Sequence, residues 1–203
     1  MTPSSPDAAR PDAARPDASR IDVRDAKAMR ALANPLRLRL LGLLRRDGAH
    51  SVGELSHLAD AAPGSVSYHL ATLERFGFVV EAPELARDGR ERWWRAAHVE
   101  THFEPSTMLA DPETAAAGRG MRQAILQGNL AEQLAYLDAE PALPMPWVQG
   151  ATAGDSIAYL TSDELRQLSD ELNELAVRWS RPRDAAPEGA EPVRIMWSAF
   201  RQP

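Results

Sequence analysis

The chain has 203 residues, of which 44% are hydrophobic and 26% are charged, and its formal net charge is −6. This composition is typical of a globular protein, and no run of about 18 apolar residues predicts a membrane span. The chain contains no cysteine, which excludes disulfides, thiolate metal sites and cysteine nucleophiles and favours a cytoplasmic location.

The charge is distributed unevenly along the chain. Residues 21–103 contain 12 Lys and Arg against 11 Asp and Glu, whereas residues 104–203 contain 8 against 15. The acidity therefore lies in the C-terminal half. The N-terminal half remains free to present a basic face to an acidic partner such as DNA.

The first twenty residues contain a Pro- and Ala-rich repeat (PDAAR, PDAAR, PDASR) with no large apolar side chain after Met1. Such a segment cannot build a core, so we expect residues 1–20 to be a disordered tail. We assign residues 21–103 to a DNA-binding domain. Residues 104–203 are then expected to serve dimerisation and effector sensing.

Caps and apolar spacing predict four helices after the tail. Asn34 before Pro35 is a typical helix start, Ser51 and Glu54 form a capping box, and Gly77 follows a helix end. A break at residues 60–62 separates the third helix from the fourth. The predicted helices cover residues 22–33, 35–46, 52–59 and 63–76.

A β-hairpin is predicted directly after the fourth helix. Residues 78–81 and 92–96 have strand character, and the turn between them includes Asp88 and Gly89. Arg87, Arg90 and Arg92 lie on or beside this turn. Arginines on a turn that follows a helix-turn-helix suit a wing that contacts the minor groove or the phosphates.

The helix over residues 63–76 has the features of a recognition helix. Val66, Leu70 and Leu73 form its buried stripe. Its other face is small and polar, as reading a major groove requires. The predicted DNA contacts on this face are Ser65, Ser67, Tyr68, His69, Thr72 and Arg75, and Arg37 and Arg39 are expected to add phosphate contacts.

Three segments resemble the ArsR/SmtB-type winged-helix repressors in the correct order: residues 32–41 (LANPLRLRLL), 65–79 (SVSYHLATLERFGFV) and 89–95 (GRERWWR). The resemblance covers about residues 22–98 and implies a homodimeric repressor that binds a palindromic operator. It also implies that Ser65, Ser67, Tyr68 and His69 read DNA. A helical wheel places His69 between the buried and exposed faces, so a packing role and a base contact are both open for it.

The metal-sensing members of that family carry a cysteine motif before the recognition helix, and this chain has none. His98, Glu100, His102 and Glu104 alternate as in a strand and would suit zinc or nickel. No His-rich helix flanks them, and an exposed polar strand end is the simpler interpretation. We therefore predict no metal and no cofactor.

The C-terminal half extends beyond the length of the minimal family members and resembles the tail of the longer actinobacterial-type members. Helices are predicted over residues 115–137 and from the capping box at Thr161 to Trp179, with a terminal strand over residues 193–200. The seam of Leu165, Leu168, Leu172 and Leu175 suits a partner helix from this chain or a second subunit. The methionine and tryptophan side chains of this half either form ordinary core, which is the simpler interpretation, or line an effector pocket. These residues are Met108, Met121, Met145, Met196, Trp147, Trp179 and Trp197.

The expected fold is α+β and mostly α, with a winged helix-turn-helix, C-terminal dimerisation helices and a small C-terminal module. We expect a sequence-specific transcriptional regulator, a repressor, that binds an inverted repeat in double-stranded DNA as a homodimer under effector control. An enzyme is not expected, since phosphate-loop, GxSxG and HExxH motifs are missing. The alternative is a winged-helix adaptor that binds a protein.

Overall fold

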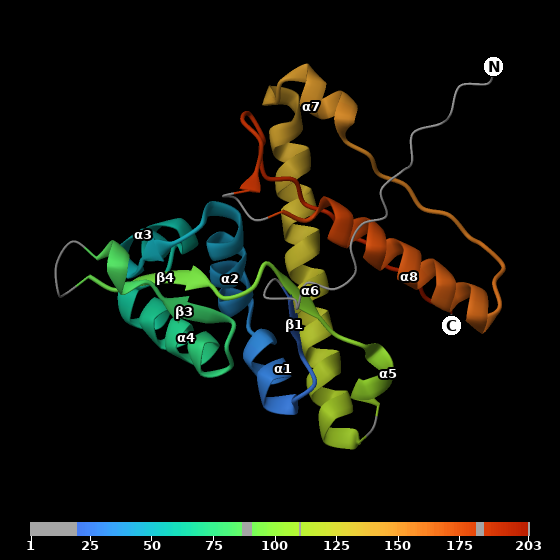
Figure 1. Cartoon of the computed structure of the whole chain (residues 1–203), viewed down its shortest axis with the longest axis horizontal. Coiled ribbons are helices and arrows are strands. Elements are labelled where there is room, and N and C mark those ends of the chain that lie inside the picture. Colours follow the sequence, from blue (N-terminus) through green and yellow to red (C-terminus); the bar gives the residue numbers. More distant parts are fainter. Residues whose placement is uncertain (1–19, 87–90, 110, 182–184, 203) are drawn as a thin grey trace, which may run out of the picture.

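The structure, a computed structural model, describes residues 20–86, 91–109, 111–181 and 185–202 (Figure 1). Its N-terminal half is a group of short helices packed on a small sheet, and a long helix runs beside it and beyond it. The described residues form eight α-helices: α1 (Ala26–Leu32), α2 (Pro35–Asp47), α3 (Val52–Ala59), α4 (Pro63–Arg75), α5 (Pro105–Met108), α6 (Pro112–Ala139), α7 (Met145–Gly150) and α8 (Ser162–Trp179).

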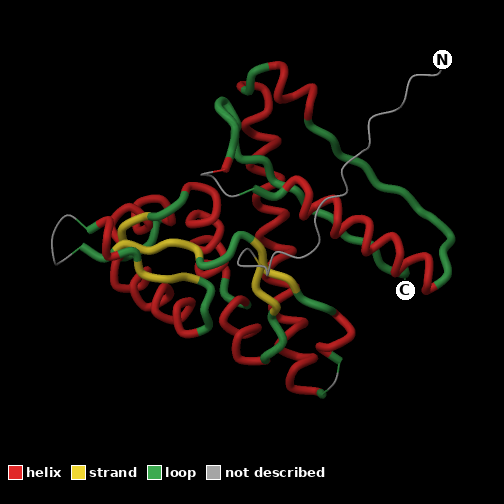
Figure 2. Tube along the Cα trace, viewed as in Figure 1, coloured by secondary structure: helices red, strands yellow, loops and turns green. Residues whose placement is uncertain are grey.

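The described strands form two small sheets (Figure 2). β2 (His50–Ser51), β4 (Trp93–Ala96) and β3 (Val79–Glu81) make an antiparallel sheet in that order, with Val80 opposite Arg95. β1 (Arg20–Asp22) and β5 (Glu100–His102) pair in parallel. The expected hairpin is therefore present, and β2 adds a third strand. This arrangement is an α+β winged helix, which confirms the predicted fold class.

The helix caps act as the sequence indicates. The Asn34 side chain accepts the Arg37 N–H, and Ser51 and Glu54 form both bonds of a capping box. Gly77 follows α4 with φ 75°, a conformation that glycine adopts without strain. The bounds of α2, α3 and α4 therefore lie within one residue of those predicted.

Two predicted elements are wrong. The first helix was expected from Asp22, but α1 begins at Ala26, because the Asp25 side chain caps it by accepting the Ala28 N–H. Residues 20–22 instead form β1, and the rest of the expected tail lies outside the described residues. The strand expected over residues 193–200 is absent, since this segment has no regular structure.

One hydrophobic core joins the winged helix to the first half of α6. Met29, Leu40, Leu55, Phe78 and Trp94 are fully buried in it. Met108, Ala117 and Met121 belong to the same cluster, and α1 packs along α6. The predicted boundary at residue 104 thus falls within a shared core, and the domain division remains a proposal.

Arg45 connects the C-terminal part of α2 to β5 and to the segment just before it. Its guanidinium donates to the His98 carbonyl oxygen over 2.9 Å and to Thr101 Oγ1 over 2.8 Å. Burial and the nearby charge of Arg194 lower the pKa of Arg45 to about 10. The residue therefore stays charged at neutral pH.

Among the described residues, no helix has the length and apolar character needed to cross a membrane.

Candidate nucleic-acid interface

Helix α4 is held on the domain by one face and leaves the other free. Val66, Leu70 and Leu73 are fully buried, and α4 packs against α2 and α3. α4 starts with Pro63 after Ala62, which makes no side-chain capping bond. The first turn of α4 therefore keeps its partial positive charge unneutralised by a capping side chain.

The outward face of α4 carries most of the predicted DNA-reading residues. Tyr68 is 67% exposed, and its ring stands edge-on to that of His69 at a centroid distance of 5.3 Å. Ser65, Ser67 and Thr72 are half-buried, and Arg75 is exposed. The Thr72 hydroxyl donates to the Tyr68 carbonyl oxygen over 2.9 Å, so its oxygen is left mainly as an acceptor.

Arg37 and His69 meet beneath this face. Arg37 donates to the carbonyl oxygens of Ala31 and, over 3.0 Å, of Arg30, both at the end of α1. Its Nη1 lies 3.3 Å from His69 Nδ1. Arginine has only donors, so Nδ1 is the acceptor, and a neutral His69 carries its proton on Nε2. Arg37, predicted to contact phosphate, is thus already bonded to α1 and α4.

Burial, followed by the positive charge of Arg37, lowers the pKa of His69 below its ordinary value. His69 is therefore neutral at physiological pH. Local sequence patterns do not predict this contact, because 32 residues separate the two side chains.

The described part of the wing is charge-compensated. Arg92 bonds the Glu81 carboxylate and lies 4.9 Å above the ring of buried Trp94, and Arg95 pairs with Glu84. Arg87 and Arg90, the other two predicted wing contacts, lie outside the described residues. Arg39 is exposed on α2 and donates to the Leu58 carbonyl oxygen over 3.0 Å.

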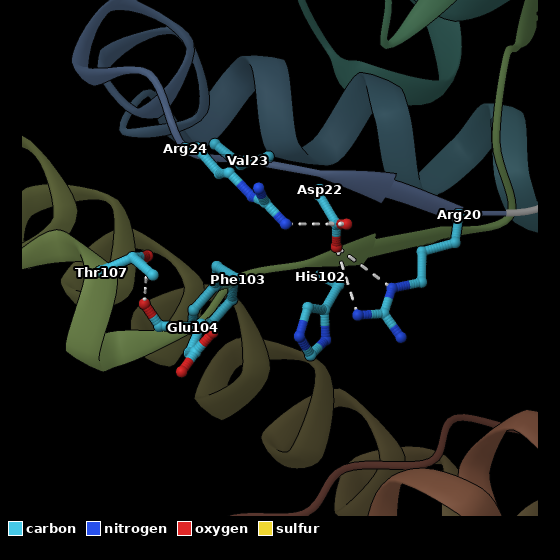
Figure 3. Close-up of a pocket in the computed structure, with 8 residues that line it drawn as sticks. All are labelled: Arg20, Asp22, Val23, Arg24, His102, Phe103, Glu104 and Thr107. Carbon is cyan, nitrogen blue, oxygen red and sulfur yellow. Dashed lines mark hydrogen bonds and ion pairs between the residues drawn. The ribbon is translucent and has the colours of Figure 1, made fainter.

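A small polar pocket of ≈ 120 Å³ lies where β1 meets the chain after β5 (Figure 3). Arg20 and Arg24 both reach the Asp22 carboxylate, over 3.2 and 3.7 Å, and the Thr107 hydroxyl bonds the Glu104 carbonyl oxygen. Pockets for effector-sized ligands are typically about 300–1,000 Å³ and mostly apolar. This pocket therefore does not supply the expected effector site.

The Met and Trp residues of the C-terminal half were expected either to form ordinary core or to line an effector pocket, and neither description fits the whole set. Met108 and Met121 are core residues, whereas Met145, Trp147, Trp179 and Trp197 are exposed. Among the described residues, no group of three or more His, Asp or Glu side chains is arranged to hold an ion, and this includes the alternating set from His98 to Glu104.

The geometry of α2 to β4 defines a winged helix-turn-helix protein. Residues 32–82 match the profile of a family described as a helix-turn-helix domain. No curated protein sequence matches the chain significantly. The crystal structure of the transcriptional regulator PA4135 is similar, with 18% identity, a TM-score of 0.29 and coverage of 73% of this chain and 79% of that one. A likeness at this level says nothing about what the chain binds.

Proposed function

We propose that this protein is a DNA-binding transcriptional regulator that reads duplex DNA with α4. The observation that carries the proposal is the division of α4 into two faces. Val66, Leu70 and Leu73 fix the helix on the domain, while Tyr68 and the neighbouring hydroxyls face outward. From Gly64 to Thr72 this helix has no carboxylate that would repel phosphate. The helix-turn-helix match over residues 32–82 supports the same function.

The finer proposal is a homodimeric repressor of the ArsR/SmtB type that binds an inverted repeat. Two copies related by a two-fold axis would place their α4 helices in successive major grooves, about 34–36 Å apart. A signal received in residues 104–203 would change this spacing, since α6 shares a core with α1 and α2. The pocket beside β1 is small and polar, so the signal on this proposal is a ligand or partner bound at the C-terminal surface.

The test is selection of bound duplexes from a random DNA library, followed by binding measurements with competitor DNA at two salt concentrations. Enrichment of an inverted repeat with half-sites about one helical turn apart would support the regulator and the dimer. Enrichment of a single half-site would support DNA reading without the dimer. Weak, salt-sensitive binding with no enriched sequence would contradict the proposal and favour the protein-binding adaptor.

A further inference from the structure

The C-terminal half of the chain exposes far more large apolar side chains than the winged helix does. The described residues include 24 exposed large hydrophobic side chains, of which 5 lie in residues 20–103 and 19 lie in residues 109–200. Among the described residues beyond Ile125, Ala176 alone is buried. This half therefore has no core of its own in a single chain. Exposed apolar patches of this extent usually mark an interface.

The second half of α6 carries one continuous apolar stripe. Leu126, Leu130, Leu134 and Leu137 are exposed by 64%, 56%, 53% and 58%. With about 100° per residue, these four positions fall within roughly 80° of one another around the helix. We call this stripe the α6 seam. It begins where α6 leaves the shared core, after Met121 and Ala124.

The chain after α7 forms an arm, defined as residues 151–179, that runs out from α6 and returns. Figure 1 shows the linker between α7 and α8 far from α6, and α8 leading back toward it. The linker has no regular structure, and its Ile157 and Tyr159 are 71% and 98% exposed. α8 adds Leu175 and Trp179, both exposed, and no described helix or strand packs extensively against it.

The chain's own C-terminal tail leaves the α6 seam open. Arg194 pairs with Glu132 over 3.2 Å and donates to Asn129 over 3.0 Å. At about 100° per residue, Asn129 and Glu132 lie roughly 100–160° around α6 from the centre of the seam. Trp197 joins the tail to α8 through a 3.2 Å bond to Asn173. These contacts anchor the arm beside α6 without covering the leucines.

The exposed area fits a second copy of the chain. The chain exposes 15441 Å², whereas a compact monomer of 22.2 kDa exposes about 9,400 Å². The residues outside the described ranges could expose at most about 4,300 Å², the area of a fully extended chain of their mass, and subtracting this bound leaves an excess of roughly 1,700 Å². A standard interface buries about 800 Å² per partner.

A second copy also brings the same seam and arm. DNA would not cover this surface, because residues 104–203 carry a net charge of −7.

We infer that the arm of each subunit packs across the α6 seam of a second copy, so that two chains dimerise by exchanging their C-terminal arms. Leucine side chains of α6 and the apolar residues of the arm then form the core that each half lacks alone. The inference rests on the homodimer of the proposed function, but not on DNA binding. The two copies contribute identical surfaces, as a two-fold interface requires.

The absence of cysteine allows a clean cross-linking test. One chain carries Leu134→Cys on the seam, a differently tagged chain carries Tyr159→Cys or Leu175→Cys on the arm, and the two are co-expressed and treated with a short bismaleimide. We expect a mixed cross-linked product at least ten times more abundant than with Leu109→Cys, an exposed control outside both surfaces. Cross-links between two Leu134→Cys chains alone would overturn the inference, because α6 would then pack directly on α6.

A single chain carrying both Leu134→Cys and Tyr159→Cys provides the second arm of the test. A cross-link within one chain at 22.2 kDa would show that the arm folds on its own seam and would overturn the exchange. Light scattering completes the design: the wild-type chain should have twice the monomer mass, and Leu130→Glu with Leu134→Glu should halve it while circular dichroism stays unchanged. A monomeric wild-type chain would also overturn the inference.

Failure of DNA selection, with the mixed cross-link present, would contradict the proposed regulator and leave the exchanged dimer standing.

Discussion

Arg37 shows how one side chain positions the proposed recognition helix. Its guanidinium bonds two carbonyl oxygens at the end of α1 and His69 on α4. Three helices thus meet at one planar group whose donors have fixed directions. His69 is held with Nδ1 inward, and its Nε2–H becomes the donor available to a bound partner.

We predict that Arg37→Ala lowers the free energy of unfolding by about 1–3 kcal/mol, because carbonyl and imidazole acceptors lose a charged donor. The pKa of His69 should rise at the same time, since one cause of its depression is removed. Urea denaturation and an NMR titration of the ring protons measure the two effects. Arg39→Ala, which removes a single bond to Leu58, is the matched control. An unchanged His69 titration in Arg37→Ala would contradict the assignment.

His69 also gives a pH dependence with a defined sign. Its pKa is lowered in the folded protein, so the unfolded chain binds the proton more readily. As pH falls below about 6.5, the ordinary histidine pKa, stability is lost until the pH passes the folded pKa. Urea unfolding at pH 7.5 and 5.5 should show a smaller loss for His69→Gln than for the wild type. Equal losses would show that His69 does not contribute.

The outward face of α4 is the place to test base reading. Replacing Ser67 and Tyr68 together by alanine should weaken binding to the selected DNA site by roughly 10- to 100-fold, since a good base contact contributes about 1–3 kcal/mol. Binding to random DNA should change little, because phosphate contacts remain. Fluorescence anisotropy with both duplexes measures this. Leu109→Ala, at an exposed site remote from α4, is the control, and an equal loss on both duplexes would contradict base reading.

At the scale of elements, two capping boxes of identical chemistry lie in different surroundings. Ser51 caps α3 and is 6% exposed, whereas Thr161 caps α8 and is exposed. Ser51→Ala should cost about 0.5–2 kcal/mol of global stability. Thr161→Ala should lower only the helicity of α8, because α8 is not part of the shared core. Denaturation and circular dichroism of both variants test this, and equal losses of global stability would contradict it.

The elements predicted well are those fixed by neighbouring residues. Asn34 and Ser51 cap the starts of α2 and α3, and Pro63 is the first residue of α4. The capping and backbone restrictions of these residues act within one turn. The start of α1 was misplaced, because strand pairing of residues 20–22 with residues 100–102 competes with helix formation. The terminal strand predicted over residues 193–200 is not part of either described sheet.

The whole molecule divides into a part with a core and a part without one. Val23 to Ala124 contain all the buried hydrophobic residues except Ala176. A chain ending at Gly150 should therefore still fold into the winged helix, but it should be less stable than the full-length dimer because it lacks the interface. On the exchanged-arm inference this chain is also monomeric. Thermal melting and light scattering test both points. A truncated chain that no longer folds would show that the arm stabilises its own winged helix.

The sequence by itself determined the order of the helices and of the β3–β4 hairpin in the winged helix, and which residues of α4 are buried. Those features follow from caps, turns and apolar spacing, which act over a few residues. Only the tertiary structure decided that Arg37 meets His69, that β1 pairs with β5, and that α6 joins the core while its seam stays open. These three features depend on contacts between residues that are distant in the chain. The free energy of such contacts is set by which surfaces pack together and not by the local propensity of each segment.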